Sequence, residues 1–416
     1  MLLMKRHVPR NAAAYFGGQI VWTGSQWLLI LVLARISGPS PVGILTFAFA
    51  LSAPFIAVSQ LALRQVLNTD ITERFTITSY RRLRLVATIS AVALIICVAT
   101  VLGYTDQALL TIIFVAIARG LESLSDIEHG LMQRGHRLDR AAISFLIRAI
   151  VSLVLGVVAL AATKSVASVA LGLAVGAATS LLLFDRRRMT STYTPHEKSH
   201  TLSKGSCSWM LLIRMSLPLT VVSLLISINA NVPRYAVEYT LGSVELGYFA
   251  AITQLISIGS LSIVSLGQAL LPEFVIAWSD NDLRRYKRLA FIYSATSLLI
   301  GLLAFAVTYV FGEEILRLLY GPSFKAAGGA FPWLVAAGAV YFVSSAAGLI
   351  AMSTGRFASL VIPYTLITCV TAVLSVLLLP RLGLQGLAVA TATGHAIGIV
   401  TPMLTISRAA KNRYHY

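Results

Sequence analysis

Stretches of about 20 consecutive apolar residues recur along the whole chain. Each stretch is long enough to cross the hydrocarbon core of a bilayer, which is about 30 Å thick. Charged residues make up only 12% of the 416 residues, too few to cover the surface of a soluble protein of this length. The pattern therefore predicts an all-α integral membrane protein, and the length of the runs excludes a β-barrel.

Polar breaks divide the apolar stretches into twelve predicted transmembrane helices. Their approximate limits are 11–36, 42–66, 82–103, 107–131, 139–162, 165–184, 210–237, 244–272, 287–311, 327–352, 357–379 and 383–407.

Lysines and arginines are distributed unevenly over the connections between these predicted helices. Of the 33 basic residues, 25 fall at the termini and alternate connections on one side, 6 fall on the other side, and 2 lie inside spans. The positive-inside rule therefore predicts that both termini are cytoplasmic. The formal net charge of +17 follows from these loop residues, which set topology and meet anionic lipid headgroups, so we do not expect nucleic acid as a partner.

The longest polar stretch lies near the middle of the chain and is rich in Ser, Thr and Lys. Such a composition is typical of a flexible linker. We therefore predict an N-terminal six-helix lobe over residues 1–184, a cytoplasmic linker over 185–209 and a C-terminal six-helix lobe over 210–416. Parallel repeats of this kind build transporters whose substrate binds between two lobes.

The two predicted lobes share a short glycine pattern. GPSPVG begins at Gly38 and GSVELG begins at Gly242, and in both a second glycine follows five residues later, at Gly43 and Gly247. Both copies lie between the first and second spans of their lobe. Turn chemistry alone could explain either copy, but the matched position indicates an internal repeat.

Charged residues inside the fourth span are the first candidates for a functional site. Arg119, Glu122 and Asp126 lie at i, i+3 and i+7, on one face of a helix, with Arg119 about 18 Å into the membrane. An arginine at that depth must face protein or water rather than lipid. Arg148 in the fifth span is a further candidate, able to share Glu122 or Asp126 or to face a cavity. A purely structural ion-pair network is the alternative.

A second polar face is predicted on the seventh span. Asn231, Arg234 and Glu238 follow one another at helical spacing, and Pro233 removes a backbone donor between them. We expect this face to line the rim of a water-filled cavity. The alternative is an arginine that reaches the membrane interface and pairs with Glu238 one turn on.

The first span carries a milder polar and aromatic stripe. Gln19, Trp22 and Gln26 share one helical face, which suits the hydroxyls and ring faces of a sugar, and Arg35 ends the span on the outer side. Ordinary hydrogen bonding between helices is the alternative.

Motifs for catalysis, nucleotide hydrolysis and metal binding are missing from the sequence. There is no P-loop, no H-E-x-x-H and no G-x-S-x-G, and the three cysteines form no ligand pattern. We therefore expect neither an enzyme nor a cofactor or metal site.

Four stretches resemble the Wzx-type polysaccharide-repeat flippases of the multidrug/oligosaccharidyl-lipid/polysaccharide exporter superfamily. They read LVLARISGPSPVGILTFAFALSAPF, NANVPRYAVEYTLGSVELGYFAAITQL with GQALLPEF, LRLLYGPSFKAAG, and LPRLGLQGLAVATATG. The resemblance implies a V-shaped, MATE-like bundle of two lobes. It further implies transport of undecaprenyl-diphosphate-linked oligosaccharides across the bacterial cytoplasmic (inner) membrane for O-antigen or exopolysaccharide biosynthesis.

With that cargo, the arginines become candidate diphosphate ligands because guanidinium forks suit such anions. Glu122, Asp126 and Glu238 become candidates for charge balance or for coupling to a proton or sodium gradient. We expect a monomer among membrane lipids, with a polysaccharide polymerase and a chain-length regulator as candidate partners. A multidrug efflux antiporter, a lipid II flippase and a non-transporting assembly partner remain alternatives.

Overall fold

A computed structural model describes residues 2–70, 74–135, 137–186, 206–354 and 361–413. Every regular element in these ranges is helical, and they contain no strand. This confirms the predicted all-α class. Helices suit a membrane because their backbone donors and acceptors are satisfied within the segment. The chain forms two compact units: unit 1 holds residues 1–37 and 44–227, and unit 2 holds residues 38–43 and 228–416.

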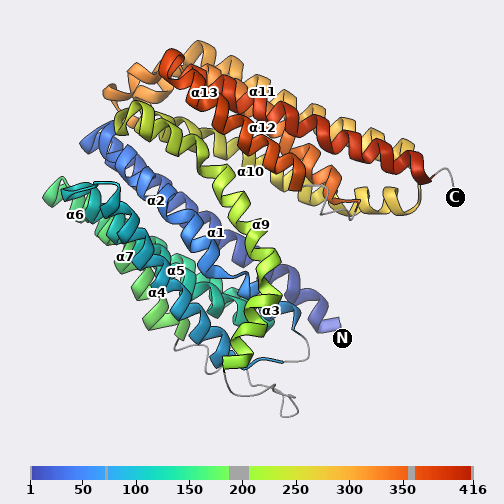
Figure 1. The fold of residues 1–416 in the computed structure, drawn as a ribbon, viewed down its shortest axis with the longest axis horizontal. Coiled ribbons are helices and arrows are strands. Elements are labelled where there is room, and N and C mark those ends of the chain that lie inside the picture. Colours follow the sequence, from blue (N-terminus) through green and yellow to red (C-terminus); the bar gives the residue numbers. More distant parts are fainter. Residues whose placement is uncertain (1, 71–73, 136, 187–205, 355–360, 414–416) are drawn as a thin grey trace. The chain divides into compact units, whose positions relative to one another are not determined.

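Helices of the N-terminal part pack mainly within unit 1 (Figure 1). They are α1 (Leu2–Ser37), α2 (Pro39–Gln60), α3 (Leu63–Thr69), α4 (Ile77–Val101), α5 (Asp106–Arg134), α6 (Leu138–Thr163) and α7 (Val166–Thr179), which continues as the π-helical turn η1 (Ser180–Asp185).

The long helix α9 (Ser206–Leu241) begins in unit 1 and ends in unit 2. Unit 2 is completed by α10 (Ser243–Ser279), α11 (Leu283–Tyr320), the 3₁₀ turn η2 (Pro322–Ala327), α12 (Phe331–Met352) and α13 (Val361–Arg413).

Eleven helices in the described ranges are long and apolar enough to span a membrane. The last of them, α13, covers two of the twelve predicted spans. Gly383 interrupts it with φ +57° and ψ −144°, a conformation that glycine adopts without the strain of a Cβ atom. Gly386 then lies against the carbonyl of Leu378, and Gly394 lies against Thr371. The chain therefore folds back at Gly383, which accounts for the twelfth predicted span.

The boundary between the two units differs from the predicted linker. It falls between Ser227 and Ile228, inside α9, because the first half of this helix packs in unit 1, where Leu212 joins a hydrophobic cluster. Of the predicted linker, residues 187–205 lie outside the described residues.

The two glycine motifs, residues 38–43 and 242–247, contact each other within unit 2. Gly38 and Gly242 both have positive φ angles, +81° and +87°, and each immediately precedes a helix. A methyl group on Gly43 would overlap the backbone of Ser243, and one on Gly247 would overlap the backbone of Pro39. The contact is reciprocal, so the glycines have a steric role beyond the turn.

Small residues allow close packing of α6 and α7 in unit 1. A methyl group on Gly172 would overlap the backbone of Gly156, and one on Gly176 would overlap Ser152. Each helix thus presents two small residues four positions apart. This small-xxx-small arrangement is typical of helix pairs in membranes, where close backbone approach replaces the hydrophobic driving force.

Tyrosines and phenylalanines fill the interior of unit 2. Tyr286, Tyr293 and Tyr320 are almost completely buried. Their hydroxyls donate hydrogen bonds to backbone carbonyls on neighbouring helices: Tyr286 to Ile350 (2.8 Å), Tyr293 to Ile263 (2.9 Å) and Tyr320 to Ala251 (3.2 Å). Each ring therefore contributes apolar area while its polar atom remains satisfied.

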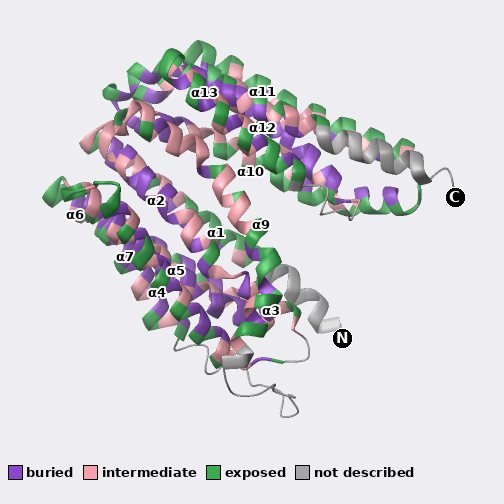
Figure 2. Cartoon of the chain, in the orientation of Figure 1, coloured by how far each residue is buried: buried purple, intermediate pink, exposed green. Residues whose placement is uncertain are grey.

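Exposed positions recur along the helices (Figure 2), and many of them carry large apolar side chains. On α11, for example, Leu299, Leu302, Leu303 and Val307 are each at least half exposed. Apolar surface on this scale is unfavourable in water but suits contact with lipid tails. The exposed side chains thus support the multi-pass membrane fold that the apolar runs predict.

Candidate functional site

Arg119, Glu122 and Arg148 form a charged cluster inside the membrane-spanning part of unit 1; we call these three residues the midspan cluster. Arg119 Nη1 lies 2.8 Å from Glu122 Oε2 on α5. Arg148 Nη1 on α6 lies 4.0 Å from the other carboxylate oxygen of Glu122. One carboxylate is thus shared by two arginines. The predicted pairs Arg119–Glu122 and Arg148–Glu122 are both present.

Aromatic rings hold the two guanidinium groups of the midspan cluster. Arg119 lies over the ring of Phe49 at 5.3 Å, and Arg148 lies over Trp22 at 5.5 Å and Phe145 at 5.8 Å. Such contacts stabilise a cation while leaving its N–H edges available. Trp22 is itself buried, so in this structure it supports Arg148 instead of presenting an open ring face.

Arg148 is the least compensated of these groups. Its side chain is 4% exposed, and its Nε and Nη2 atoms have no hydrogen-bond partner among the described residues. A buried donor without a partner costs about 1–3 kcal/mol, and more when it is charged. The structure thus leaves two buried guanidinium donors of Arg148 uncompensated.

Asp126, the next acidic residue along this face of α5, belongs to a separate network. Its two carboxylate oxygens accept from Arg64 Nη1 on α3 (3.0 Å) and from Arg84 Nη2 on α4 (3.1 Å). Arg84 is 1% exposed and also donates to Ser123. Asp126 therefore balances the charge of two arginines on neighbouring helices.

Two further buried pairs lie toward the same end of unit 1. Glu128 accepts two hydrogen bonds from Arg81, of 2.8 and 2.6 Å, and is 5% exposed. His129 Nε2 lies 3.6 Å from the fully buried Asp185 and 3.0 Å from the hydroxyl of Ser144. Together with Asp126, these groups connect α3, α4, α5, α6 and η1.

The remaining predicted residues of unit 1 lie on α1. Gln19 is exposed and Gln26 is half-buried, each one turn from Trp22. Arg35 is exposed in the last turn of α1. Of the predicted α1 residues, Trp22 is the one that the structure places in contact with the midspan cluster.

In unit 2, the predicted face of α9 forms local hydrogen bonds. Arg234 Nη1 donates to the side-chain oxygen of Asn231 (3.1 Å) and to the carbonyl of Ala230 (2.7 Å). Asn231 is buried, while Arg234 and Glu238 are half-buried. The helix continues through Pro233 to Leu241.

Sequence reasoning missed the arginines that bind Asp126 and Glu128. Arg64 lies on a short helix that follows a break at Leu61 and Ala62, both of which have positive φ angles, and the predicted span ran through this break. Arg81 and Arg84 were counted as loop charges. The spacing of Arg81 and Arg84, one turn apart within an amphipathic stretch, was the available signal.

Among the residues searched, no group of three His, Cys, Asp or Glu side chains is placed to hold a metal ion. Cys97 and Cys369 are exposed and free. The chemistry of unit 1 is thus that of arginines against fewer carboxylates, which suits an anion.

Comparison with known proteins identifies the family of the chain and agrees with the fold. Residues 8–278 match the family described as polysaccharide biosynthesis protein, well over half of the chain. The chain belongs to this family. It is also 24% identical, over 394 residues, to the capsular polysaccharide biosynthesis protein CapF of Staphylococcus aureus, with 94% of this chain and 97% of that protein aligned.

Solved structures show which fold the family member adopts. The lipid II flippase MurJ in an inward closed conformation matches with a TM-score of 0.74 at 13% identity, over 95% of this chain and 87% of that one. An inward-facing MATE family transporter of the MOP superfamily matches with a TM-score of 0.66 at 15% identity, over 96% and 95%. The predicted MATE-like fold is therefore confirmed.

Proposed function

We propose that this protein is a flippase that moves undecaprenyl-diphosphate-linked oligosaccharide repeat units across the bacterial cytoplasmic membrane by alternating access. Surface polysaccharide biosynthesis would use the product on the outer face. The family match and the transporter-like fold support a role in moving a polysaccharide precursor. The proposal includes the predicted topology, with both termini in the cytoplasm.

Arg148 is the observation that carries this proposal. It is buried inside a membrane-spanning helix, stacked on two aromatic rings, and has two N–H-bearing atoms without a partner among the described residues. A diphosphate carries several acceptor oxygens and at least two negative charges, so it can satisfy these donors. Arg119 is the second proposed ligand in unit 1. Its side chain is half-exposed and pairs with the same carboxylate, Glu122.

Glu122 would make binding of the cargo diphosphate to the midspan cluster reversible. With two arginines and one carboxylate, the cluster has a formal charge of +1 before cargo binds. A diphosphate can displace Glu122 from one arginine, and Glu122 can take the arginine back when the cargo leaves. Such competition keeps binding weak enough for release, which a transporter requires.

The charge of the midspan cluster also argues against the multidrug alternative. A site for cationic drugs requires excess negative charge for electrostatic complementarity, whereas this cluster has excess positive charge. A lipid II flippase would handle a diphosphate as well, so it remains the rival that experiment must separate. The proposed role of Arg234 and Asn231 is to contact the cargo from unit 2.

Lipid extracts from cells that lack this gene would test the proposal. Mass spectrometry should show accumulation of one oligosaccharide repeat on its polyprenyl diphosphate carrier, together with loss of surface polymer. Accumulation of lipid II would favour the rival flippase. Sensitivity to cationic drugs without lipid accumulation would overturn the proposal in favour of efflux.

Variants of the protein, expressed in cells that lack the native gene, would test the proposed roles of individual arginines. Arg148→Gln should lower polymer output about tenfold or more, because a hydrogen bond to a charged group contributes about 1.5–3 kcal/mol. Arg119→Ala and Arg234→Ala should also lower output while leaving expression intact. Arg317→Ala is the matched control, since Arg317 is exposed and pairs only with its helical neighbour Glu314 among described carboxylates. Full output from Arg148→Gln at normal protein levels would remove Arg148 from the cargo site.

A further inference from the structure

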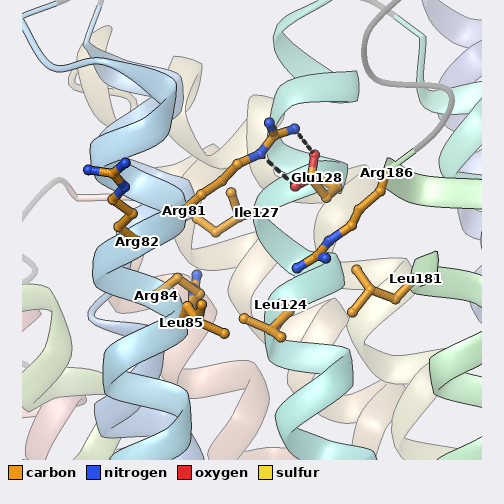
Figure 3. A pocket seen from close by; sticks show the side chains of 9 residues that line it. All are labelled: Arg81, Arg82, Arg84, Leu85, Leu124, Ile127, Glu128, Leu181 and Arg186. Carbon is orange, nitrogen blue, oxygen red and sulfur yellow. Dashed lines mark hydrogen bonds and ion pairs between the residues drawn. The ribbon is translucent and has the colours of Figure 1, made fainter.

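A second basic site lies away from the midspan cluster, where α4 begins and where α5 and η1 end (Figure 3). It is a pocket of about 270 Å³ lined by four arginines, one glutamate and four aliphatic residues. We call it the arginine pocket. By the positive-inside prediction it opens at the cytoplasmic end of unit 1. The proposed cargo site makes no use of it.

Two of the four arginines are already bound to carboxylates. Arg81 is held by Glu128 through two hydrogen bonds, drawn as dashed lines in Figure 3, and Arg84 is held by Asp126. A third carboxylate at this end, Asp185, is fully buried against His129. Asp126 and Glu128 are therefore occupied by arginines, whereas the carboxylate oxygens of Asp185 accept no hydrogen bond among the described residues.

The remaining two arginines leave the pocket with excess positive charge. Neither Arg82 nor Arg186 forms an ion pair with a carboxylate in the described part of the chain. In addition, Nε of the fully buried Arg84 has no hydrogen-bond partner among the described residues. A buried guanidinium donor without a partner is costly, so it indicates a place for an acceptor from outside the chain.

Of these two arginines, Arg186 is the one arranged to meet such an acceptor. Figure 3 shows Arg186 extending back across the pocket toward α5, so that its guanidinium lies among the lining residues, while Arg82 extends to the far side of α4. Arg186 directly follows η1, where the helix widens to a π-helical turn. Turns of this kind inside α-helices are frequent at functional sites because they redirect side chains.

The rest of the pocket is apolar and continues onto lipid-facing surface. Leu85, which is 39% exposed, belongs to the lining, and Val86 and Ile89 extend the exposed apolar strip along α4. On the other side, Leu181 lines the pocket and is followed by the exposed Leu182 and Leu183. A ligand that uses both parts has an anionic head and an apolar tail.

We propose that the arginine pocket binds the phosphate headgroup of an anionic lipid, with the acyl chains lying along the exposed leucines and isoleucine of α4 and η1. Basic pockets between membrane helices on the cytoplasmic side are suited to such headgroups. Free phosphate would meet the same arginines but would leave the aliphatic lining unused. Because the site is separate from Arg119, Glu122 and Arg148, this inference does not depend on the proposed function.

Native mass spectrometry of the purified full-length protein would test this site. The probes are phosphatidylglycerol, the zwitterionic phosphatidylcholine as a lipid control, and inorganic phosphate as a competitor. We expect one tightly retained phosphatidylglycerol, at least about tenfold preferred over phosphatidylcholine, because charge-assisted hydrogen bonds to phosphate are the stronger class. An equal response to the two lipids would overturn the proposal. Displacement of phosphatidylglycerol by millimolar phosphate would assign the pocket to a free anion and overturn the lipid reading.

Variants of Arg186 would show whether phosphatidylglycerol binds in the arginine pocket. Arg186→Gln should weaken retention of phosphatidylglycerol about fivefold, and the charge reversal Arg186→Glu should abolish it, because each basic group near the surface contributes roughly that factor. Arg186 is exposed, so both proteins are expected to fold, which size-exclusion profiles would confirm. Arg288→Gln is the matched control, since Arg288 is an exposed arginine on α11 of unit 2. Equal retention by the Arg186→Glu and Arg288→Gln proteins would overturn the assignment to this pocket.

Discussion

Unit 1 buries charged side chains in its interior, whereas the described interior of unit 2 buries aromatic side chains without charged ones. In unit 1, Arg84, Arg148 and Glu128 are all less than one-tenth exposed and connect neighbouring helices through ion pairs. In the described part of unit 2, the ion pairs lie at the surface, as between Arg317 and Glu314, whose side chains are both more than half exposed. The two units of one chain thus use different chemistry to hold their helices together.

The difference bears on where an anion can bind. A buried arginine that shares its carboxylate with a second arginine retains donors for a ligand, as Arg148 does. A buried tyrosine whose hydroxyl already bonds a backbone carbonyl, as in Tyr293, has no spare donor. The described interior of unit 1 therefore contains buried charged donors without partners, whereas the hydroxyls of the three buried tyrosines of unit 2 are bonded to carbonyls.

The largest effect should follow from removal of Asp126. Asp126→Ala leaves the buried Arg84 and the half-buried Arg64 without their carboxylate, and breaking a buried pair costs about 3–5 kcal/mol. We expect a loss of about 3 kcal/mol in the free energy of unfolding, since Asp126 is itself partly exposed. Thermal unfolding in detergent, followed by size-exclusion chromatography, would measure it.

A double variant distinguishes lost charge pairing from lost packing. Arg84→Met combined with Asp126→Ala removes both the buried cation and its partner, so it should be more stable than Asp126→Ala alone. If the double variant is the less stable protein, the interior of unit 1 depends on packing in the same way as unit 2, and the contrast between the units disappears.

An intermediate effect is expected from Tyr293→Phe in unit 2. The change removes the hydrogen bond to the carbonyl of Ile263 and leaves the ring in place, so we expect a loss of about 1 kcal/mol. The same unfolding assay applies. A loss as large as that of Asp126→Ala would show that the hydroxyl, and not the ring, stabilises this core.

A substitution at Gly267 tests the surroundings of the Tyr293 hydroxyl independently. A methyl group at Gly267 would overlap the hydroxyl of Tyr293 as well as Leu349. Gly267→Ala should therefore destabilise by about 1–3 kcal/mol in the native background and by less in the Tyr293→Phe background. Strict additivity of the two changes would mean that they do not share this contact.

The smallest effect should come from Glu314→Gln. This residue forms an exposed pair with Arg317, three residues away on α11, and such pairs contribute about 0–1 kcal/mol. We expect a shift in the unfolding midpoint near the error of the assay, and less still at high salt. A loss comparable to that of Asp126→Ala would contradict the view that charge pairing matters in unit 1 and not in unit 2.

Local spacing explains which parts of the site could be predicted. The separation of three residues that places Arg119 and Glu122 on one helical face also accounts for their contact. The matched positions of the glycines indicated a repeat, but not the close backbone contacts of Gly43 and Gly247. The contact of Arg64 with Asp126 could not be predicted in this way, because helical periodicity identifies a face but not the helix that it meets. The break at Leu61 and Ala62 that carries Arg64 into place also has no glycine or proline to mark it.

The spans were predicted well because membrane helices must satisfy their backbone internally and so follow hydropathy closely. Two features of the fold could not be predicted from hydropathy. The boundary between the units lies inside α9, since a continuous helix can pack with different partners at its two ends. The turn at Gly383 is so tight that the last two predicted spans follow each other almost without a loop.

The reciprocal glycine contact has the geometry of an isologous interface. Gly43 meets Ser243, and Gly247 meets Pro39. In both contacts the second glycine of one motif packs against the residue that follows the first glycine of the other motif. Symmetric homodimers use self-complementary patches of this kind, and there one substitution changes both contacts at once. Within a single chain the two contacts can be altered one at a time. The glycine contact within unit 2 therefore has the symmetry of a dimer interface, while each of its two copies can be substituted separately.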